Sequence, residues 1–121
     1  MNKKVINLVA VVGGASCISA DDGQKVHDAI LAELKQGNKV QLSFAGVEDL
    51  TTAFLNVAVG QLYGELDEAI LKEQMLPPVD ASEVNLGRLK RAVDWAKLFF
   101  ANPARLKRVV QDARGHSDEP E

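Results

Sequence analysis

The sequence predicts one α/β domain, because strand patterns alternate with helix patterns along its first half. The chain has 121 residues, a length typical of a single domain with its own core. Its hydrophobic fraction of 46% and charged fraction of 26% are those of a globular protein. Strand, helix, strand and helix follow one another within residues 5–66, which indicates a βαβ unit with parallel strands.

The first predicted element is a strand over residues 5–12. This stretch is rich in β-branched residues and ends at Gly13-Gly14, as is typical of a strand buried on both faces. The lysines before it and Cys17 after it also resemble a short secretory or lipoprotein signal. We favour the strand, because the apolar stretch is only eight residues long and is interrupted by Asn7.

A helix is expected next, beginning at Ser19 and ending near Gly37. Ser19 and Asp22 have the spacing of a capping box, and apolar residues recur every four positions over 26–34. His27 lies off this apolar stripe, so we interpret it as a solvent-exposed residue and not as a metal ligand.

A second strand is predicted over residues 40–44, where apolar and polar residues alternate. After a connection over 45–50, Thr51-Thr52 opens a segment over 53–66 that is apolar on almost every side. We expect this helix to be largely covered by the rest of the protein. The simplest role for the threonine pair is an N-cap, in which a hydroxyl accepts a hydrogen bond from a free backbone amide.

The second half of the chain is predicted to be mainly helical. Trp95 and the nearby phenylalanines are expected to pack in the core. Residues 1–113 then form the single domain, and residues 114–121 form a polar tail. The further elements are a helix over 67–75 ending at Pro77-Pro78, a third strand or extended segment over 79–84, a helix over 85–101 and a last helix over 104–113.

No pattern in the sequence indicates catalysis, a metal or a cofactor. Cys17, His27 and His116 are too far apart for metal-ligand spacing. Carboxylate pairs such as Glu48-Asp49 are expected at helix starts or in turns, where they favour the helix dipole. We therefore expect a protein that is not an enzyme. A single cysteine allows no internal disulfide, which fits a cytoplasmic protein, and no stretch approaches the ~20 apolar residues of a membrane span.

The C-terminal helices carry a run of cations. The net charge of −3 argues against a surface built as a whole for nucleic acid, so we interpret the run as a solvent-exposed helix face. A small nucleic-acid-associated protein that uses this run is an alternative, and a homodimer through any uncovered part of Trp95, Leu98 and Phe99 is another. With Asp94 as the nearby counter-charge, the run consists of Arg88, Lys90, Arg91, Lys97, Arg105, Lys107 and Arg108.

Residues 39–66, KVQLSFAGVEDLTTAFLNVAVGQLYGEL, resemble the STAS domain, and more closely the small stand-alone STAS-like proteins of bacteria. The stretches SADDGQKVHDAILAELKQG and LKRAVDWAKLFFANP extend the resemblance over most of residues 19–103. The resemblance implies a mixed sheet of about four strands with helices packed on it. It also implies a non-catalytic regulatory module that binds other proteins in signalling.

The STAS family includes anti-sigma-factor antagonists, in which a histidine-kinase-like ATPase phosphorylates a serine at a helix start. Thr52 falls on that serine, and Thr51 falls on the acidic residue before it. The antagonists have Ser-Gly after the serine, whereas this chain has Ala53-Phe54. STAS-like proteins also commonly have an acidic residue within the preceding strand, where this chain has Ser43. The resemblance implies phosphorylation at Thr52 or Thr51.

The threonine pair and the resemblance together predict a partner-binding surface on the loop and helix start over 48–56. The expected partner is an ATPase or an anti-sigma-type regulator that resembles a kinase. The expected contact residues are Glu48, Asp49, Thr51, Thr52 and Asn56.

Overall fold

The strands lie in two parallel pairs. The computed structural model describes residues 2–101, and within them β1 (Lys3–Asn7) pairs with β3 (Lys39–Ser43). β2 (Ser16–Cys17) pairs with β4 (Asp49–Leu50). The predicted α/β class is confirmed. The predicted last helix and the polar tail lie outside the described residues.

Residues 75–79 run beside β3 as an interrupted third strand. Isolated parallel bridges join the two ends of this segment to β3, and the amides of Leu76 and Val79 donate hydrogen bonds to carbonyls of β3. Pro77 and Pro78 lie between the bridges, and proline has no amide hydrogen to continue a ladder. The predicted extended segment therefore starts earlier than expected. The strand pairing is parallel throughout the described residues, where the resemblance implied a mixed sheet.

The first predicted strand is shorter than expected, because a helix replaces its second half. The chain turns from β1 into α1 (Leu8–Val12) at Asn7, whose side chain accepts a 2.8 Å hydrogen bond from the amide of Ala10. Gly13 then closes the helix with a φ of 88°. A capping side chain at Asn7 outweighs the β-branched composition of the stretch.

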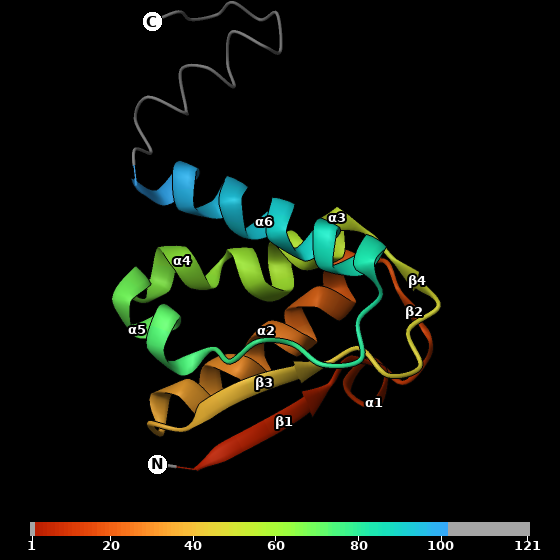
Figure 1. The fold of residues 1–121 in the computed structure, drawn as a ribbon, viewed down its shortest axis with the longest axis horizontal. Coiled ribbons are helices and arrows are strands. Elements are labelled where there is room, and N and C mark those ends of the chain that lie inside the picture. Colours follow the sequence, from red (N-terminus) through yellow and green to blue (C-terminus); the bar gives the residue numbers. More distant parts are fainter. Residues whose placement is uncertain (1, 102–121) are drawn as a thin grey trace, which may run out of the picture.

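The helices are stacked in layers on one side of the β1–β3 pair (Figure 1). α2 (Ala20–Lys35) lies against the strands and begins as predicted, since the Ser19 hydroxyl accepts a 3.1 Å hydrogen bond from the amide of Asp22. Val26 and Ile30 are fully buried in the core beneath it.

The next layer is the segment predicted as one helix over 53–66. It consists of α3 (Thr52–Leu55), the π-helical turn η1 (Asn56–Gly60) and α4 (Leu62–Glu65). The amide of Gln61 donates a 3.0 Å hydrogen bond to the carbonyl of Asn56, five residues earlier. The segment lies between α2 and α6, which explains why it is apolar on most sides (Figure 1).

The outer layer is α6 (Glu83–Ala101), which follows α5 (Glu68–Gln74) and the segment beside β3. Ala92 and Ala96 are its buried residues. The prediction that Trp95 packs in the core is wrong, because 47% of its surface is exposed. The alanines let α6 approach the π-turn closely, and this leaves the larger Trp95 at the edge of the contact. Within residues 2–101, none of the helices combines the length and apolar character that crossing a bilayer requires.

Candidate functional site

Thr51 is the N-cap of α3. Its hydroxyl accepts a 3.1 Å hydrogen bond from the amide of Phe54 and donates a 2.7 Å hydrogen bond to the carbonyl of Ile18. Ile18 directly follows β2, so this side chain ties the end of the β2–β4 pair to the start of the helix. The hydroxyl proton of Thr51 is therefore held in a hydrogen bond within the protein.

The side chain of Thr52, in contrast, is free of such hydrogen bonds within the described residues. Thr52 is the first residue of α3, and its side chain is exposed. The two threonines are neighbours in the sequence, yet only Thr52 presents a hydroxyl that is accessible to an outside reactant.

Thr52 and Asn56 line one hollow together with Arg91 and Trp95 of α6, with a volume of about 240 Å³. A second hollow of about 300 Å³ continues from Asn56 and Trp95 along the line between the π-turn and α6. We call the two together the η1–α6 groove. Its lining residues are Thr52, Asn56, Val57, Gly60, Gln61, Arg91, Ala92, Trp95, Ala96, Phe99 and Phe100.

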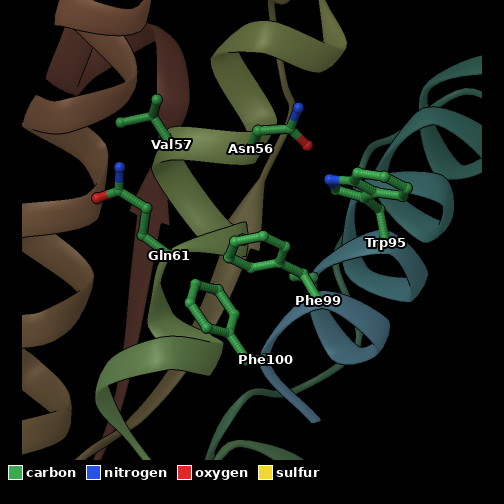
Figure 2. A pocket seen from close by; sticks show the side chains of 8 residues that line it. Asn56, Val57, Gln61, Trp95, Phe99 and Phe100 are labelled. Carbon is green, nitrogen blue, oxygen red and sulfur yellow. The ribbon is translucent and has the colours of Figure 1, made fainter. Parts of the chain in front are cut away.

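The aromatic side chains of α6 form one wall of this groove. In Figure 2 the indole of Trp95 lies across from the side chain of Asn56, and Phe99 and Phe100 lie further along α6. The rings of Phe99 and Phe100 meet edge to face, with their centroids 4.8 Å apart. The small residues Gly60 and Ala96 form part of the lining between the walls.

The structure does not bring all the predicted contact residues together. Glu48 and Asp49 are exposed beside the β2–β4 pair, where the Asp49 carboxylate accepts a 3.0 Å hydrogen bond from the Ser16 hydroxyl. Neither acidic residue lines the groove that contains Thr52 and Asn56. The predicted surface over 48–56 therefore has two parts, an acidic edge and a groove.

The cations of α6 differ in their surroundings. Lys90 pairs with Asp94 at 2.9 Å, and Lys97 pairs with Glu68 at 3.5 Å, so Asp94 is not the sole counter-charge. Arg91 is exposed and has no ion pair with a described residue. The predicted cations at 105, 107 and 108 lie outside the described residues.

His27 was expected to be exposed, and this is wrong, because only 3% of its surface is accessible. Its Nε2 lies 2.6 Å from Oε1 of Glu65, and its Nδ1 lies 3.0 Å from Oδ1 of Asp28. Burial lowers the pKa of His27, but the hydrogen bonds to Asp28 and Glu65 outweigh burial and raise the pKa above its usual value. The raised pKa favours the charged ring, and the contact between His27 and Glu65 joins α2 to the end of α4, which is a structural arrangement.

Cys17 is buried, and burial followed by the nearby charge of Asp22 raises the pKa of its thiol. This environment favours the unreactive thiol over the thiolate. In the part of the chain that the structure describes, no three His, Cys, Asp or Glu side chains are placed to bind a metal ion.

A separate cavity of about 360 Å³ lies between the segment beside β3 and the helices α4, α5 and α6. Its lining is mostly apolar and includes Leu62, Leu71 and Val93. It shares no lining residue with the groove and contains none of the predicted site residues.

Sequence reasoning missed Arg91 and Trp95 as neighbours of Thr52, because only the packing of α6 on the π-turn brings them together. One signal was present. Trp95 and Leu98 fall outside the main apolar stripe of α6, and large apolar residues off the stripe of an amphipathic helix indicate a second contact surface.

In this small α/β fold, a helix opened by an exposed hydroxyl residue lies beside the η1–α6 groove. Residues 22–79 match a family described as a STAS-like domain of unknown function, and this match confirms the resemblance over that region. The matched region includes Thr51, Thr52 and Asn56 and ends before α6. No curated protein and no solved structure matches the chain.

Proposed function

We propose that this protein is a non-catalytic regulatory module that binds a protein partner through the surface over 48–56 and is switched by phosphorylation of Thr52. The observation that carries the proposal is the exposed hydroxyl of Thr52 beside Arg91, which has no ion pair within residues 2–101. The match to a STAS-like family supports a regulatory role, because the STAS domains that the sequence resembles include anti-sigma-factor antagonists.

The hydrogen bonds of the two threonines favour Thr52 over Thr51 as the modified residue. A kinase must reach the hydroxyl oxygen and remove its proton. Thr51 donates that proton to the carbonyl of Ile18, whereas Thr52 is exposed. Phosphorylation of Thr51 would also remove the N-cap of α3.

Arg91 supplies a charge for the modified state. A phosphate adds about two negative charges and three strong acceptor oxygens. Because Thr52 and Arg91 line one hollow, the phosphate would lie within reach of a guanidinium that no described carboxylate occupies. The rare π-helical turn that begins at Asn56 lies in the same groove, and such turns occur frequently at functional sites.

The proposed partner is a histidine-kinase-like ATPase or an anti-sigma-type regulator in the cytoplasm, where ATP is available for the phosphorylation. The proposed module itself uses no metal or cofactor. The cation run gives the nucleic-acid alternative less support than expected, because Lys90 and Lys97 are paired with carboxylates.

The test compares Thr52→Glu with Thr52→Gln, which has a similar shape and no charge. Each variant and the wild type are used to capture partners from the host lysate in the presence of ATP, and the wild type is analysed for phosphate by mass spectrometry. We expect phosphate on Thr52, and a partner that wild type and Thr52→Gln hold but Thr52→Glu loses. An unmodified Thr52, together with the same partners on all three proteins, would contradict the switch.

A further inference from the structure

Several apolar side chains at the end of α6 are exposed to solvent. Trp95 is 47% exposed and Leu98 is 56% exposed, and Phe100 is also exposed. Large apolar side chains that gather at a surface hollow mark interaction sites more often than isolated ones do. Tryptophan in particular is enriched among the residues that contribute most to protein binding.

The shape of the η1–α6 groove fits a helix. The groove follows α6 from Arg91 to Phe100, a distance of about 14 Å at 1.5 Å per residue. This length corresponds to between two and three turns of a partner helix. Gly60 and Ala96 are small, buried residues in the lining of the groove, and Trp95 and Phe99 provide apolar contacts.

The charges around the groove select the kind of helix. Arg91 lies at the end of the groove near Thr52, and no carboxylate of residues 2–101 lines the groove. Arg88, one turn before Arg91, donates a hydrogen bond to the neutral side chain of Asn85 at 3.4 Å. Complementarity therefore requires negative charge on the partner near this end of the groove.

We propose that the η1–α6 groove binds an acidic amphipathic helix of the protein partner, with apolar side chains against Trp95 and Phe99 and a carboxylate on Arg91. This inference rests on the proposed function, because it names the chemistry of the partner at the same surface. It also explains the switch. A phosphate on Thr52 and the carboxylate of the partner compete for the same guanidinium, so phosphorylation weakens binding of the partner.

A second copy of this chain fits the groove less well. The described residues of α6 that line the groove include no carboxylate, so the same face of a second copy would not supply the negative charge that complements Arg91. Nucleic acid also fits less well, since affinity for phosphates depends on several cations, and among the described lining residues Arg91 is the one cation.

The test selects peptides from a displayed library of random helices of about 14 residues, with the full-length protein as bait. Trp95 is the single tryptophan of the chain, so its fluorescence reports binding in the groove directly. We expect the selected peptides to be acidic and amphipathic and to shift this fluorescence. We expect Arg91→Glu to weaken their binding about tenfold or more and a Lys-for-Glu peptide to restore it. The control is Lys90→Glu, which changes a cation of α6 outside the groove.

Peptides without net negative charge, binding that Arg91→Glu leaves unchanged, or a library that yields no groove-binding peptide would each overturn the inference. Light scattering that shows a dimer with Trp95 shielded would assign the groove to a second copy and overturn the inference as well.

The same variants distinguish a failure of this inference from a failure of the proposed function. If acidic helices bind the groove but Thr52→Glu and Thr52→Gln bind them equally, the groove is a binding site for acidic helices and phosphorylation of Thr52 does not control it. If Thr52→Glu loses the cellular partner but no acidic helix is selected, the phosphorylation switch is supported and the proposed binding of an acidic helix is contradicted.

Discussion

Nε2 of His27 in α2 lies 2.6 Å from Oε1 of Glu65 at the end of α4, and the other ring nitrogen faces Asp28. A buried imidazole between two carboxylates joins two helix layers of the fold. The two carboxylates favour the charged ring over the neutral ring, and this makes the stability of the protein depend on pH.

The first prediction concerns that dependence. The pKa of His27 is raised in the folded protein, so its contribution is complete below the unfolded pKa of about 6.5 and is lost as pH rises through the folded pKa. Hydrogen bonds from His27 and then Gln24 lower the pKa of Asp28, so that its contribution is present above about pH 4 and is lost on further acidification. We expect the stabilisation to be largest between about pH 4 and 6.5.

Urea unfolding of wild type and His27→Gln over a range of pH measures this effect. The difference in free energy of unfolding should be largest in the mildly acidic range and should shrink toward alkaline pH. Glu65→Gln is the control that removes one carboxylate and should flatten the same curve. The pH range of about 5 to 9 brackets the ordinary histidine pKa of about 6.5. A difference in the free energy of unfolding that stays constant over this range would contradict a charged His27.

The second prediction separates the two threonines. Thr51→Ala removes an N-cap and a hydrogen bond to the carbonyl of Ile18, so we expect a loss of about 1–2 kcal/mol in the free energy of unfolding. Thr52→Ala removes an exposed hydroxyl and should change the free energy by less than about 0.5 kcal/mol. Chemical denaturation of both variants is the measurement. Equal losses would show that the assignment of the cap to Thr51 is wrong.

The third prediction concerns glycines in close contacts. A Cβ added to Gly23 would lie 2.6 Å from the carbonyl oxygen of Phe54, which belongs to the backbone and cannot move freely. We expect Gly23→Ala to destabilise the protein by about 1–3 kcal/mol. A Cβ on Gly64 would overlap the ring of Phe100, which is partly exposed and can rotate away, so Gly64→Ala should be milder.

Gly87 is the matched control for this series, because it lies within α6 and a Cβ there would meet no atom within 4 Å. Gly87→Ala should stabilise the protein by about 0.5–1 kcal/mol through helix propensity. Thermal and chemical unfolding of the three variants give the ranking. If Gly23→Ala is as stable as Gly87→Ala, α2 and α3 are not packed as closely as the structure shows.

The fourth prediction tests whether a charge at position 52 interacts with Arg91. In a double-mutant cycle of Thr52→Glu and Arg91→Ala, we expect a favourable coupling of about 0.5 kcal/mol, as is usual for exposed pairs, and a smaller value at high salt. The stability of the four proteins is measured by chemical denaturation. The same cycle with Lys90→Ala should give no coupling, since Lys90 does not line this hollow. A coupling of zero at low salt with Arg91 would remove the support for the phosphate contact.

The sequence by itself determined the features that depend on near neighbours. The cap at Ser19, the buried residues Val26 and Ile30, and the strand Lys39–Ser43 follow from residues a few positions apart. Hydroxyl caps and hydrophobic periodicity act over one or two turns, so a single sequence contains the information they need. The STAS-like resemblance also came from such local patterns, and it is confirmed for residues 22–79.

Only the tertiary structure decided which side chains from distant segments meet. His27 is off the apolar stripe of α2 and is buried because Glu65 of α4 reaches it. Trp95 is exposed because the small Ala92 and Ala96 occupy the contact with the π-turn. The neighbourhood of Thr52 and Arg91 arises in the same way. Burial and charge pairing depend on the layer that covers a helix, and the periodicity of that helix alone does not specify the layer.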